Sequence, residues 1–273
     1  MRLYICRYIG GLWYALWGKN LYQYFPEHYV FVDLFSGLGQ VTLNKKRSKL
    51  EVINDIDDNI YNLFLVLRNN FQEFEHKFRY LIYSRKQFEE YMKQYKKDRL
   101  TSLEPVERAI AFFYLLNTTM TTLDSGFRRA VTRGTRFLTC FSDKVLERLE
   151  LVRRRLKGVL IERLDFRDCI KKYDSPSTFF FCDPPFMVKR RLYEFDMTKE
   201  DHYELAEFLS NIEGKFLLIH VENEDFYDVY GQFNILAKMK KQKAMEVKAK
   251  NREFQTYVLI GNYKIEESLK KWL

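Results

Sequence analysis

The chain has 273 residues and carries 46 basic against 37 acidic side chains, a formal net charge of +9. Hydrophobic residues make up 47% of the sequence, which excludes a disordered chain. No apolar run approaches the ~20 residues of a membrane span, so we expect no membrane association. Met1 to Gly10 lacks the apolar core and cleavage site of a signal peptide, so we expect a cytoplasmic protein. The basic excess favours a polyanionic partner such as DNA or RNA.

The cysteines do not form a metal-binding pattern. Cys6, Cys140, Cys169 and Cys182 include no C-x-x-C pair, and none stands near a histidine at ligand spacing. A zinc site is therefore not expected. Free thiols in a reducing compartment fit this spacing better, and we expect no metal.

The first strand signal is Val30 to Leu34, a short apolar run that leads into the glycine turn Phe35-Ser36-Gly37-Leu38-Gly39. A second short strand, Leu50 to Ile53, ends in an acidic cluster that contains Asp55. Strand, glycine turn, helix, strand and acid form the first half of a Rossmann-like unit.

The middle of the chain has helical periodicity from about Asn59 to Leu116, with Pro105 suited to the first turn of one helix. Asn117 to Phe141 loses this periodicity and is rich in Thr, Gly and Arg, which predicts an exposed loop. Ser142 is a candidate N-cap for a helix that runs to about Lys157 and is closed by Gly158.

The last part of the chain returns to strand patterns. The predicted strands are Val159 to Ile161, Thr178 to Cys182, Phe216 to Ile219, Phe233 to Leu236 and Phe254 to Gly261. The last two are expected to form a closing antiparallel pair, joined by the lysine-rich segment Lys238 to Arg252.

The glycine turn and the acid after the second strand indicate a nucleoside site. Glycines let a backbone approach a ligand closely, and Asp55 stands where an acid meets ribose hydroxyls in Rossmann-type sites. The turn is shorter than the dinucleotide fingerprint, so a nucleoside without a diphosphate fits better. An ordinary glycine turn followed by a solvated acidic loop is the alternative.

The strongest signal is Asp183-Pro184-Pro185-Phe186, which follows four apolar or aromatic residues. Two prolines remove two backbone donors and stiffen the turn. The Asp183 carboxylate and the Pro184 carbonyl are two acceptors that suit the two hydrogens of an aromatic amino group, and Phe186 suits stacking on a base. The alternative is a structural proline turn in which Asp183 bonds its own backbone.

These motifs resemble, in order and nearly end to end, the Dam-like DNA adenine N6-methyltransferases of the D12 class, phage and mobile-element type. The matching segments are Tyr8-Ile9-Gly10-Gly11, Phe35 to Gly39, Val52 to Ile56, Ala111 to Leu115, Asp165-Phe166, Asp183 to Phe186, Asp201-His202 with Leu205-Ala206, and Gly261-Asn262-Tyr263.

The resemblance implies an α/β, Rossmann-like S-adenosylmethionine-dependent methyltransferase fold, with a seven-stranded mixed sheet whose last strand is antiparallel. Residues 1–58 and 158–273 are then the catalytic domain, and residues 59–157 an inserted, mainly helical target-recognition region. The implied catalytic residues are Asp183, Pro184, Pro185 and Phe186. The implied cofactor-binding residues are Tyr8, Gly10, Gly11, Lys19, Asp33, Phe35, Ser36, Gly37, Gly39, Asp55, Ile56, Asp165 and Phe166.

Two positions depart from the family pattern. Leu12 stands where the family usually has lysine, and nearby Lys19 is a candidate substitute. Phe186 stands where the family usually has tyrosine; it keeps the stacking face and lacks the hydroxyl.

The expected partner is double-stranded DNA, with a cognate restriction endonuclease as a candidate partner and a monomer or weak dimer as the expected state. The candidate DNA contacts are Arg128, Arg129, Arg133, Arg136, Lys189 and Arg190; Arg191 belongs to the same basic cluster as Lys189 and Arg190. A solvated charged face is the alternative for each cluster. Two other functions stay open: RNA base amino-methylation on the same fold, and a catalytically inactive DNA-binding relative.

Overall fold

We analysed a computed structural model, which describes residues 2–6, 18–119, 123, 126–128, 140–187, 195–242 and 254–264. The described helices are η1 (Gly18–Tyr24), α2 (Gln40–Asn44), α3 (Asp58–Asn69), α4 (Phe71–Arg79), α5 (Arg85–Asp98), α6 (Pro105–Thr118), α7 (Asp143–Leu156), α8 (Phe166–Tyr173), α9 (Lys199–Asn211) and α10 (Glu224–Tyr230). The described strands are β1 (Val30–Asp33), β2 (Leu50–Asn54), β3 (Val159–Glu162), β4 (Thr178–Cys182), β5 (Lys215–Val221), β6 (Asn234–Gln242) and β7 (Phe254–Gly261).

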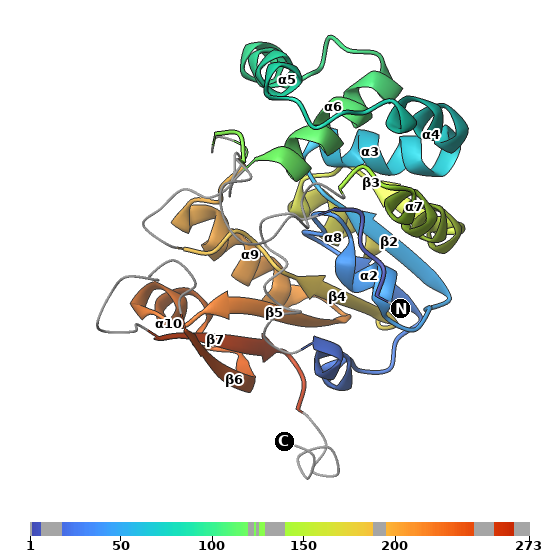
Figure 1. Ribbon diagram of the computed structural model, residues 1–273. Helices are drawn as coiled ribbons and strands as arrows, with labels where there is room; N and C mark the ends of the chain where they lie inside the picture. The colour runs from blue at the N-terminus through green and yellow to red at the C-terminus, as the bar shows by residue number, and fades with distance from the viewer. Residues whose placement is uncertain are drawn as a thin grey trace. The chain divides into compact units, whose positions relative to one another are not determined.

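The strands form one seven-stranded sheet in the order β3-β2-β1-β4-β5-β7-β6 (Figure 1). β1 runs parallel to both β2 and β4, and β4 runs parallel to β5. β7 is antiparallel to its neighbours β5 and β6. The predicted mixed sheet with an antiparallel last strand is confirmed. The sequence of β4, Thr-Phe-Phe-Phe-Cys, is buried throughout, as expected for an inner parallel strand that is covered on both faces.

The chain divides into two compact units. The first comprises Met1–Ile9, Gly37–Lys45 and Asp55–Arg163; the second comprises Gly10–Ser36, Lys46–Asn54 and Leu164–Leu273. The helices of the predicted insertion lie in the first unit, together with the segment after the glycine turn. The assignment of residues 59–157 as a target-recognition region stays a prediction.

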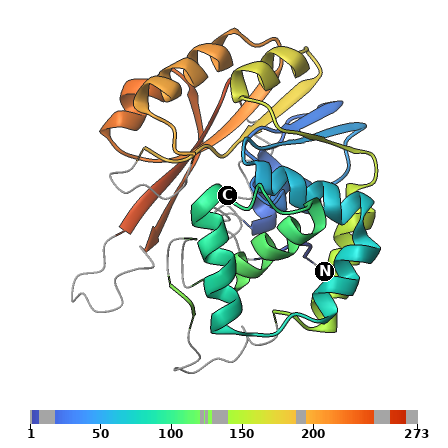
Figure 2. The ribbon, with the colours of Figure 1, turned by 90° about the horizontal axis from the view of Figure 1, so that it is seen from above.

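The first unit is built around α6. Helices α3, α4 and α5 each pack against α6, and α7 packs against α3 and α4 (Figures 1 and 2). From Ala109 to Leu116 every residue of α6 is buried. A helix that is apolar all round must sit inside its unit, so α6 is the centre of a helical bundle. Pro105 stands in the first turn of α6, as predicted.

In the second unit, α8, α9 and α10 lie side by side on one face of the sheet (Figure 2). Their apolar stripes meet the inward side chains of the strands in one core, with Cys169 from α8, Leu205 from α9 and Phe226 from α10. These side chains follow the helical spacing that buries one stripe and leaves the opposite face polar. In the part of the chain that the structure describes, no helix is long and apolar enough to span a membrane.

The structure corrects several local predictions. The segment from Asn117 is not a wholly exposed loop: Thr118 ends α6, and both Thr118 and Thr119 are buried, with Thr119 bridged to Phe127. Ser142 is the N-cap of α7, but its side chain makes no capping hydrogen bond.

Strand β6 also differs from its prediction, because it extends to Gln242 through the first lysines of the segment that was expected to be a connection. The antiparallel register with β7 explains this difference, because Lys240 and Lys241 pair with Thr256 and Gln255 in the ladder. Alternating lysines are compatible with an edge strand, whose outer side faces water.

Candidate functional site

The turn formed by Asp183-Pro184-Pro185-Phe186 begins where β4 ends, beside the end of β1. Within the sheet Asp33 of β1 pairs with Phe181 of β4, two residues before Asp183. The chain leaves β1 toward β2 on one side, and β4 lies on the other side, so the strand order reverses between β1 and β4. Ligands of open α/β sheets bind at such a switch point, outside the carboxyl ends of the strands. The topology therefore places two aspartates, Asp33 and Asp183, at the position where a ligand is expected.

The two carboxyl groups interact electrostatically. Asp33 is 1% exposed and Asp183 is half-buried. Burial raises the pKa of Asp183 well above its ordinary value, and the neighbouring charge of Asp33 raises it further. Among the residues that the structure describes, the Asp183 carboxylate has no hydrogen-bond or ion-pair partner. A cationic or hydrogen-bond-donating ligand would supply the interaction that these described residues do not provide.

The rest of the turn is held by its backbone. Pro184 is buried and Phe186 is half-buried. The Met187 N–H donates to His220 Nε2 (3.1 Å), and the Met187 carbonyl accepts from Asn223 Nδ2 (2.9 Å). The Phe186 ring meets the His220 ring edge-on, with 5.2 Å between their centroids. The sequence analysis identified neither His220 nor Asn223. A histidine inside the apolar run of β5 is the sequence signal by which His220 could have been found.

A second residue missed from the sequence is Asn54, at the end of β2. Its Nδ2 donates to the carbonyls of Leu34 and Leu164 (3.1 Å each), and its Oδ1 accepts from the Leu164 N–H (2.9 Å). The Asn54 carbonyl accepts from Ser36 N–H at 2.9 Å. One buried amide therefore joins the end of β1, the end of β2 and the chain before Asp165, three segments that carry predicted cofactor contacts.

Asp165 and Phe166 open helix α8. The Asp165 side chain is its N-cap and accepts from the Arg167 N–H at 2.9 Å. The Arg167 guanidinium also binds Asp165 Oδ1 and Oδ2 (3.1 Å each) and lies 4.3 Å from the centre of the Phe166 ring. Phe166 is 6% exposed and packs 5.9 Å from the Phe35 ring. The contacts of Asp165 and Phe166 with the cofactor stay a prediction. Arg167 would compete with the cofactor for the Asp165 carboxylate.

The first unit contains the glycine turn and Asp55. Gly37 and Gly39 have φ angles of 50° and 64°, in the left-handed region that favours glycine. The Gly37 N–H donates to Asp55 Oδ2 (2.8 Å), and the Asp57 N–H donates to Asp55 Oδ1 (2.9 Å). Ile56 is next in the chain, and its apolar side chain is 44% exposed. Asp55 is thus oriented by backbone amides from both the glycine turn and its own turn.

The N-terminal segment before the predicted cofactor motif is also held in the first unit. Asn44 of α2 pairs with both backbone groups of Leu3, at 2.8 Å to the N–H and 2.7 Å to the carbonyl. Arg148 of α7 lies 3.8 Å from the centre of the Tyr4 ring and donates to the Tyr4 carbonyl (2.9 Å). Burial lowers the pKa of this guanidinium, while Tyr4 favours its charged form. These contacts fix residues 3–4 just upstream of position 8.

Several predicted site residues lie outside what the structure describes. For the cofactor these are Tyr8, Gly10 and Gly11, and the side chain of Lys19; for DNA they are Arg129, Arg133, Arg136, Lys189, Arg190 and Arg191. Of the predicted DNA contacts the structure places Arg128, whose N–H donates to the Thr118 carbonyl (2.8 Å) and whose carbonyl accepts from the Tyr83 hydroxyl (2.7 Å).

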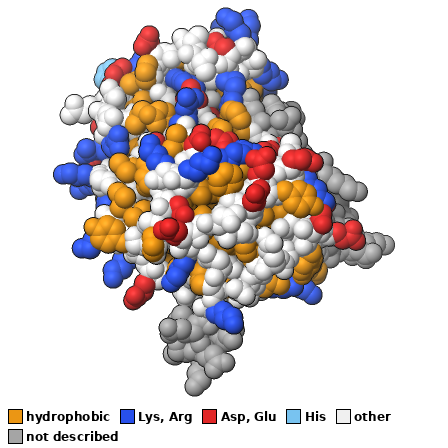
Figure 3. All heavy atoms as spheres, turned by 180° about the vertical axis from the view of Figure 1, so that it is seen from behind, with side chains coloured by type: hydrophobic (Ala, Val, Ile, Leu, Met, Phe, Trp, Pro, Cys, Tyr) orange, Lys and Arg blue, Asp and Glu red, His pale blue; other side chains and the backbone are white. Residues whose placement is uncertain are grey.

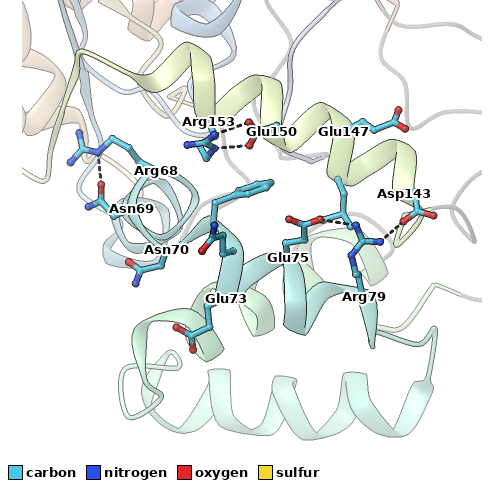
Figure 4. Close-up of a pocket in the computed structure, with 13 residues that line it drawn as sticks. Arg68, Asn69, Asn70, Glu73, Glu75, Arg79, Asp143, Glu147, Glu150 and Arg153 are labelled. Atoms are coloured by element: carbon cyan, nitrogen blue, oxygen red, sulfur yellow. Dashed lines mark hydrogen bonds and ion pairs between the residues drawn. The ribbon is translucent and has the colours of Figure 1, made fainter.

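A groove of about 970 Å³ lies in the first unit among α3, α4 and α7 (Figure 4). It contains none of the predicted site residues. Its arginines are engaged by acidic or amide partners, as Arg79 is by Glu75 and Asp143 and Arg153 is by Glu150. A polar, internally paired groove of this kind is a poor nucleoside site, because nucleoside pockets have mainly apolar walls.

The surface charge is mixed on the face that Figure 3 shows. Basic, acidic and apolar side chains are interspersed there, so the net charge of +9 is not collected on this face. Among the described residues no group of three or more His, Cys, Asp or Glu side chains is arranged to hold a metal ion.

Comparison with known proteins identifies the family. A search of curated proteins found no match. Residues 8–245 match the model of the D12 class N6 adenine-specific DNA methyltransferases, a span that contains the glycine turn, the acidic motif, the helical block and Asp183 to Phe186. The chain therefore belongs to the D12 class N6 adenine-specific DNA methyltransferase family.

Proposed function

We propose that this chain transfers a methyl group from S-adenosylmethionine to the N6 amino group of adenine at defined sites in double-stranded DNA. The observation that carries the proposal is the Asp33–Asp183 pair at the switch point between β1 and β4, with Asp183 opening the Asp-Pro-Pro-Phe turn. Family membership gives the reaction class; the site residues are our assignment.

The carboxylates at the switch point suit a cationic methyl donor. A buried acid pair that raises the pKa of one member is stabilised by a nearby positive charge. S-adenosylmethionine supplies an already activated methyl group on a positively charged sulfur. We assign Asp33, Phe35, Ser36, Asp165 and Phe166 of the second unit to its binding.

The family resemblance also assigns residues of the first unit to the donor. We assign Asp55, whose carboxylate is oriented by the Gly37 and Asp57 amides, to the ribose hydroxyls. Gly37 and Gly39 keep the turn free of side chains, and Ile56 offers an exposed apolar contact. We also assign Tyr8, Gly10, Gly11 and Lys19 to the donor, from the family motif alone.

Asp183, Pro184 and Phe186 act on the base. The Asp183 carboxylate and the Pro184 carbonyl each accept one hydrogen of the amino group, which concentrates the nitrogen lone pair for attack on the methyl carbon. As the nitrogen–methyl bond forms, the methyl–sulfur bond of the donor breaks and its electron pair stays on the sulfur. The nitrogen then loses a proton, and the raised pKa of Asp183 makes its carboxylate a suitable proton acceptor. Phe186 stacks on the base, a contact worth about 1–3 kcal/mol. The thiol of Cys182 is no competing nucleophile, because burial raises its pKa well above the ordinary value.

Paired adenine must leave the helix stack to reach such a turn. Flipping costs a few kcal/mol, which the contacts of Asp183 and Phe186 would repay. We propose Arg128, Arg129, Arg133, Arg136, Lys189 and Arg190 as DNA contacts, with the helical bundle of the first unit as the target-recognition region.

The direct test is incorporation of tritiated methyl groups by the purified protein. Unmethylated duplex DNA, the same sequence as single strands, and RNA of matched sequence are incubated side by side, and the product nucleoside is identified by mass spectrometry. Formation of N6-methyladenosine in RNA alone would favour RNA base amino-methylation as the function. Donor binding without transfer to any substrate would favour a catalytically inactive relative. Sequencing that detects N6-methyladenine in an expressing host then gives the recognition site and shows whether a restriction partner is needed.

A further inference from the structure

The backbone that follows Phe186 is held by side chains from β5 and from the start of α10. Met187, the residue after the turn, has both backbone groups engaged. Its N–H donates to His220 Nε2 at 3.1 Å and its carbonyl accepts from Asn223 Nδ2 at 2.9 Å. Such a double contact fixes the direction of the chain as it leaves Phe186. None of the motifs that indicated a methyltransferase includes either side chain.

His220 is arranged to act only as an acceptor toward Met187. Its Nδ1–H donates to the Val221 carbonyl (2.8 Å), which leaves the Nε2 lone pair for the Met187 N–H. The ring is buried and is enclosed by His202, Phe226, Tyr230 and Phe186. Burial is the main cause that lowers the pKa of His220 to about 4; the hydrogen bond to Val221 opposes this shift, and the nearby His202 adds to it. The imidazole is therefore neutral at neutral pH, the form that this contact requires.

Asn223 joins the turn to a helix. Its Oδ1 accepts from the Phe226 N–H (2.8 Å) as the N-cap of α10, while its Nδ2 donates to the Met187 carbonyl. The amide side chain provides an acceptor for the helix and a donor for Met187; aspartate would cap the helix equally well and lose the second bond.

His202 supports the same region from α9. Its Nδ1 is 2.7 Å from the Tyr230 hydroxyl, and its buried Nε2 has no partner within hydrogen-bond limits among the described residues. The Pro185 backbone is nonetheless close enough to favour the protonated form of His202, against a burial that lowers its pKa to about 4. Because proline has no backbone N–H, the Pro185 group that favours the protonated ring is its carbonyl.

We propose that His220 and Asn223 are positioning residues for methyl transfer: by holding Met187 from both sides they fix the Phe186 ring and the carbonyl acceptors of the turn. This rests on the proposed function, and it assigns neither residue a contact with the base or the methyl donor. The expected result of releasing Met187 is a lower kcat, because a displacement of about 1 Å in a reacting group costs on the order of 100-fold in rate.

The sharpest test is Asn223→Asp, which keeps the helix cap and removes the donor to Met187. We expect kcat for DNA methylation to fall about 10- to 100-fold with the KM for S-adenosylmethionine unchanged. The matched control is Asn262→Asp. Asn262 also bridges a backbone N–H and a carbonyl, those of Phe216 and Gly214, but at the opposite end of β5. The control should lose thermal stability comparably and keep kcat within about twofold.

The histidine is tested by His220→Gln and His220→Leu. Glutamine can place its Oε1 near the position of Nε2 and accept from the Met187 N–H, whereas leucine fills the space without an acceptor. We expect the glutamine variant to retain most of kcat and the leucine variant to lose it. Equal kcat in the two variants at equal thermal stability would overturn the role of His220.

A readout that does not depend on activity separates this proposal from the proposed function. Hydrogen exchange of the peptide that contains Met187 should be slow in the unmodified protein and faster in Asn223→Asp and His220→Leu, with Asn262→Asp unchanged. Unchanged exchange in both variants would show that His220 and Asn223 do not hold Met187, whatever the activity, and would overturn the proposal. If the unmodified protein transfers no methyl group, the proposed function fails, and the exchange result alone decides whether Met187 is held as described.

Discussion

Asp55 and Asp183 both follow the end of a buried parallel strand, yet their carboxylates differ in their hydrogen-bond partners and in their electrostatic surroundings. Asp55 receives the N–H groups of Gly37 and Asp57, at 2.8 and 2.9 Å, so the protein itself orients its charge. Asp183 has no such partner among the described residues, and burial beside Asp33 raises its pKa well above the ordinary value. A carboxylate that the protein already orients, such as Asp55, suits a binding role. A carboxylate whose ionised form is destabilised, such as Asp183, suits a role in which the substrate supplies the missing partner.

The largest effect that would test this contrast is expected from Asp183→Asn. The amide keeps the shape and removes the charge, so methylation should fall about 100- to 1,000-fold while the donor still binds. Because the ionised carboxyl is costly in the folded state, the same variant should melt at a higher temperature near neutral pH. Tritiated-methyl transfer and thermal melting measure the two effects. Full retention of turnover would contradict the catalytic assignment.

Asp55→Asn should act on binding instead. One amide oxygen cannot replace two carboxylate acceptors, and loss of a charged hydrogen bond costs about 1.5–3 kcal/mol, or on the order of 10- to 150-fold in affinity for S-adenosylmethionine. Calorimetry measures this loss. Asp98→Asn is the matched control, because Asp98 Oδ1 also accepts the backbone N–H two residues later, that of Leu100 (2.9 Å), elsewhere in the first unit. Equal loss of affinity in both variants would remove Asp55 from the ribose site.

The raised pKa of Asp183 predicts a pH dependence of donor binding. A cationic donor favours the ionised carboxylate, so its binding releases a proton below that pKa. Affinity should therefore rise with pH through the raised pKa, by at most about tenfold per pH unit, and level off above it. The neutral product S-adenosylhomocysteine should respond less, and Asp183→Asn should flatten the difference between the two ligands. Parallel profiles for both ligands in calorimetry would show that Asp183 does not sense the sulfonium charge.

The smallest effect concerns the glycine turn that orients Asp55. Gly39→Ala places a side chain at φ 64° and should destabilise the protein by about 1–2 kcal/mol, measured by denaturant unfolding. Gly126→Ala is the control, because no heavy atom of the described residues lies within 4 Å of the added methyl group and the φ of Gly126 is not in the left-handed range. Equal destabilisation in the two variants would mean that the left-handed angle at Gly39 carries no cost.

Much of the sheet could be predicted from local patterns. β1, β2, β4, β7 and the start of β6 contain short apolar runs, and the helices of the first unit repeat their apolar residues at helical spacing. The predictions were wrong where a partner decided the structure. Thr118 is buried because it ends an enclosed helix, and Lys240 is a strand residue because β7 pairs with it. A polar or basic sequence does not reveal such a partner.

The candidate site, like the sheet, has features that the local sequence predicts and features that depend on distant partners. The order of the glycine turn, the acidic motif, the helical block and Asp183 to Phe186 was enough to indicate the family, and the family model confirmed it. The roles of His220, Asn54 and Asn223 were not visible in that order. Each of these side chains bonds a backbone group far away in the sequence, and one-dimensional spacing carries no information about such contacts.

The sequence by itself determined the reaction class and the strands that present it, because short motifs bring their own turn chemistry and short apolar runs bounded by turn residues favour buried strands. Tertiary structure alone decided that Asp33 lies beside Asp183 and that His220 and Asn223 hold Met187. Those neighbours come from strand order in a parallel sheet, in which long crossovers bring distant segments to the same edge. The raised pKa of Asp183 is a consequence of that order, since it depends on burial and on a charge from another strand.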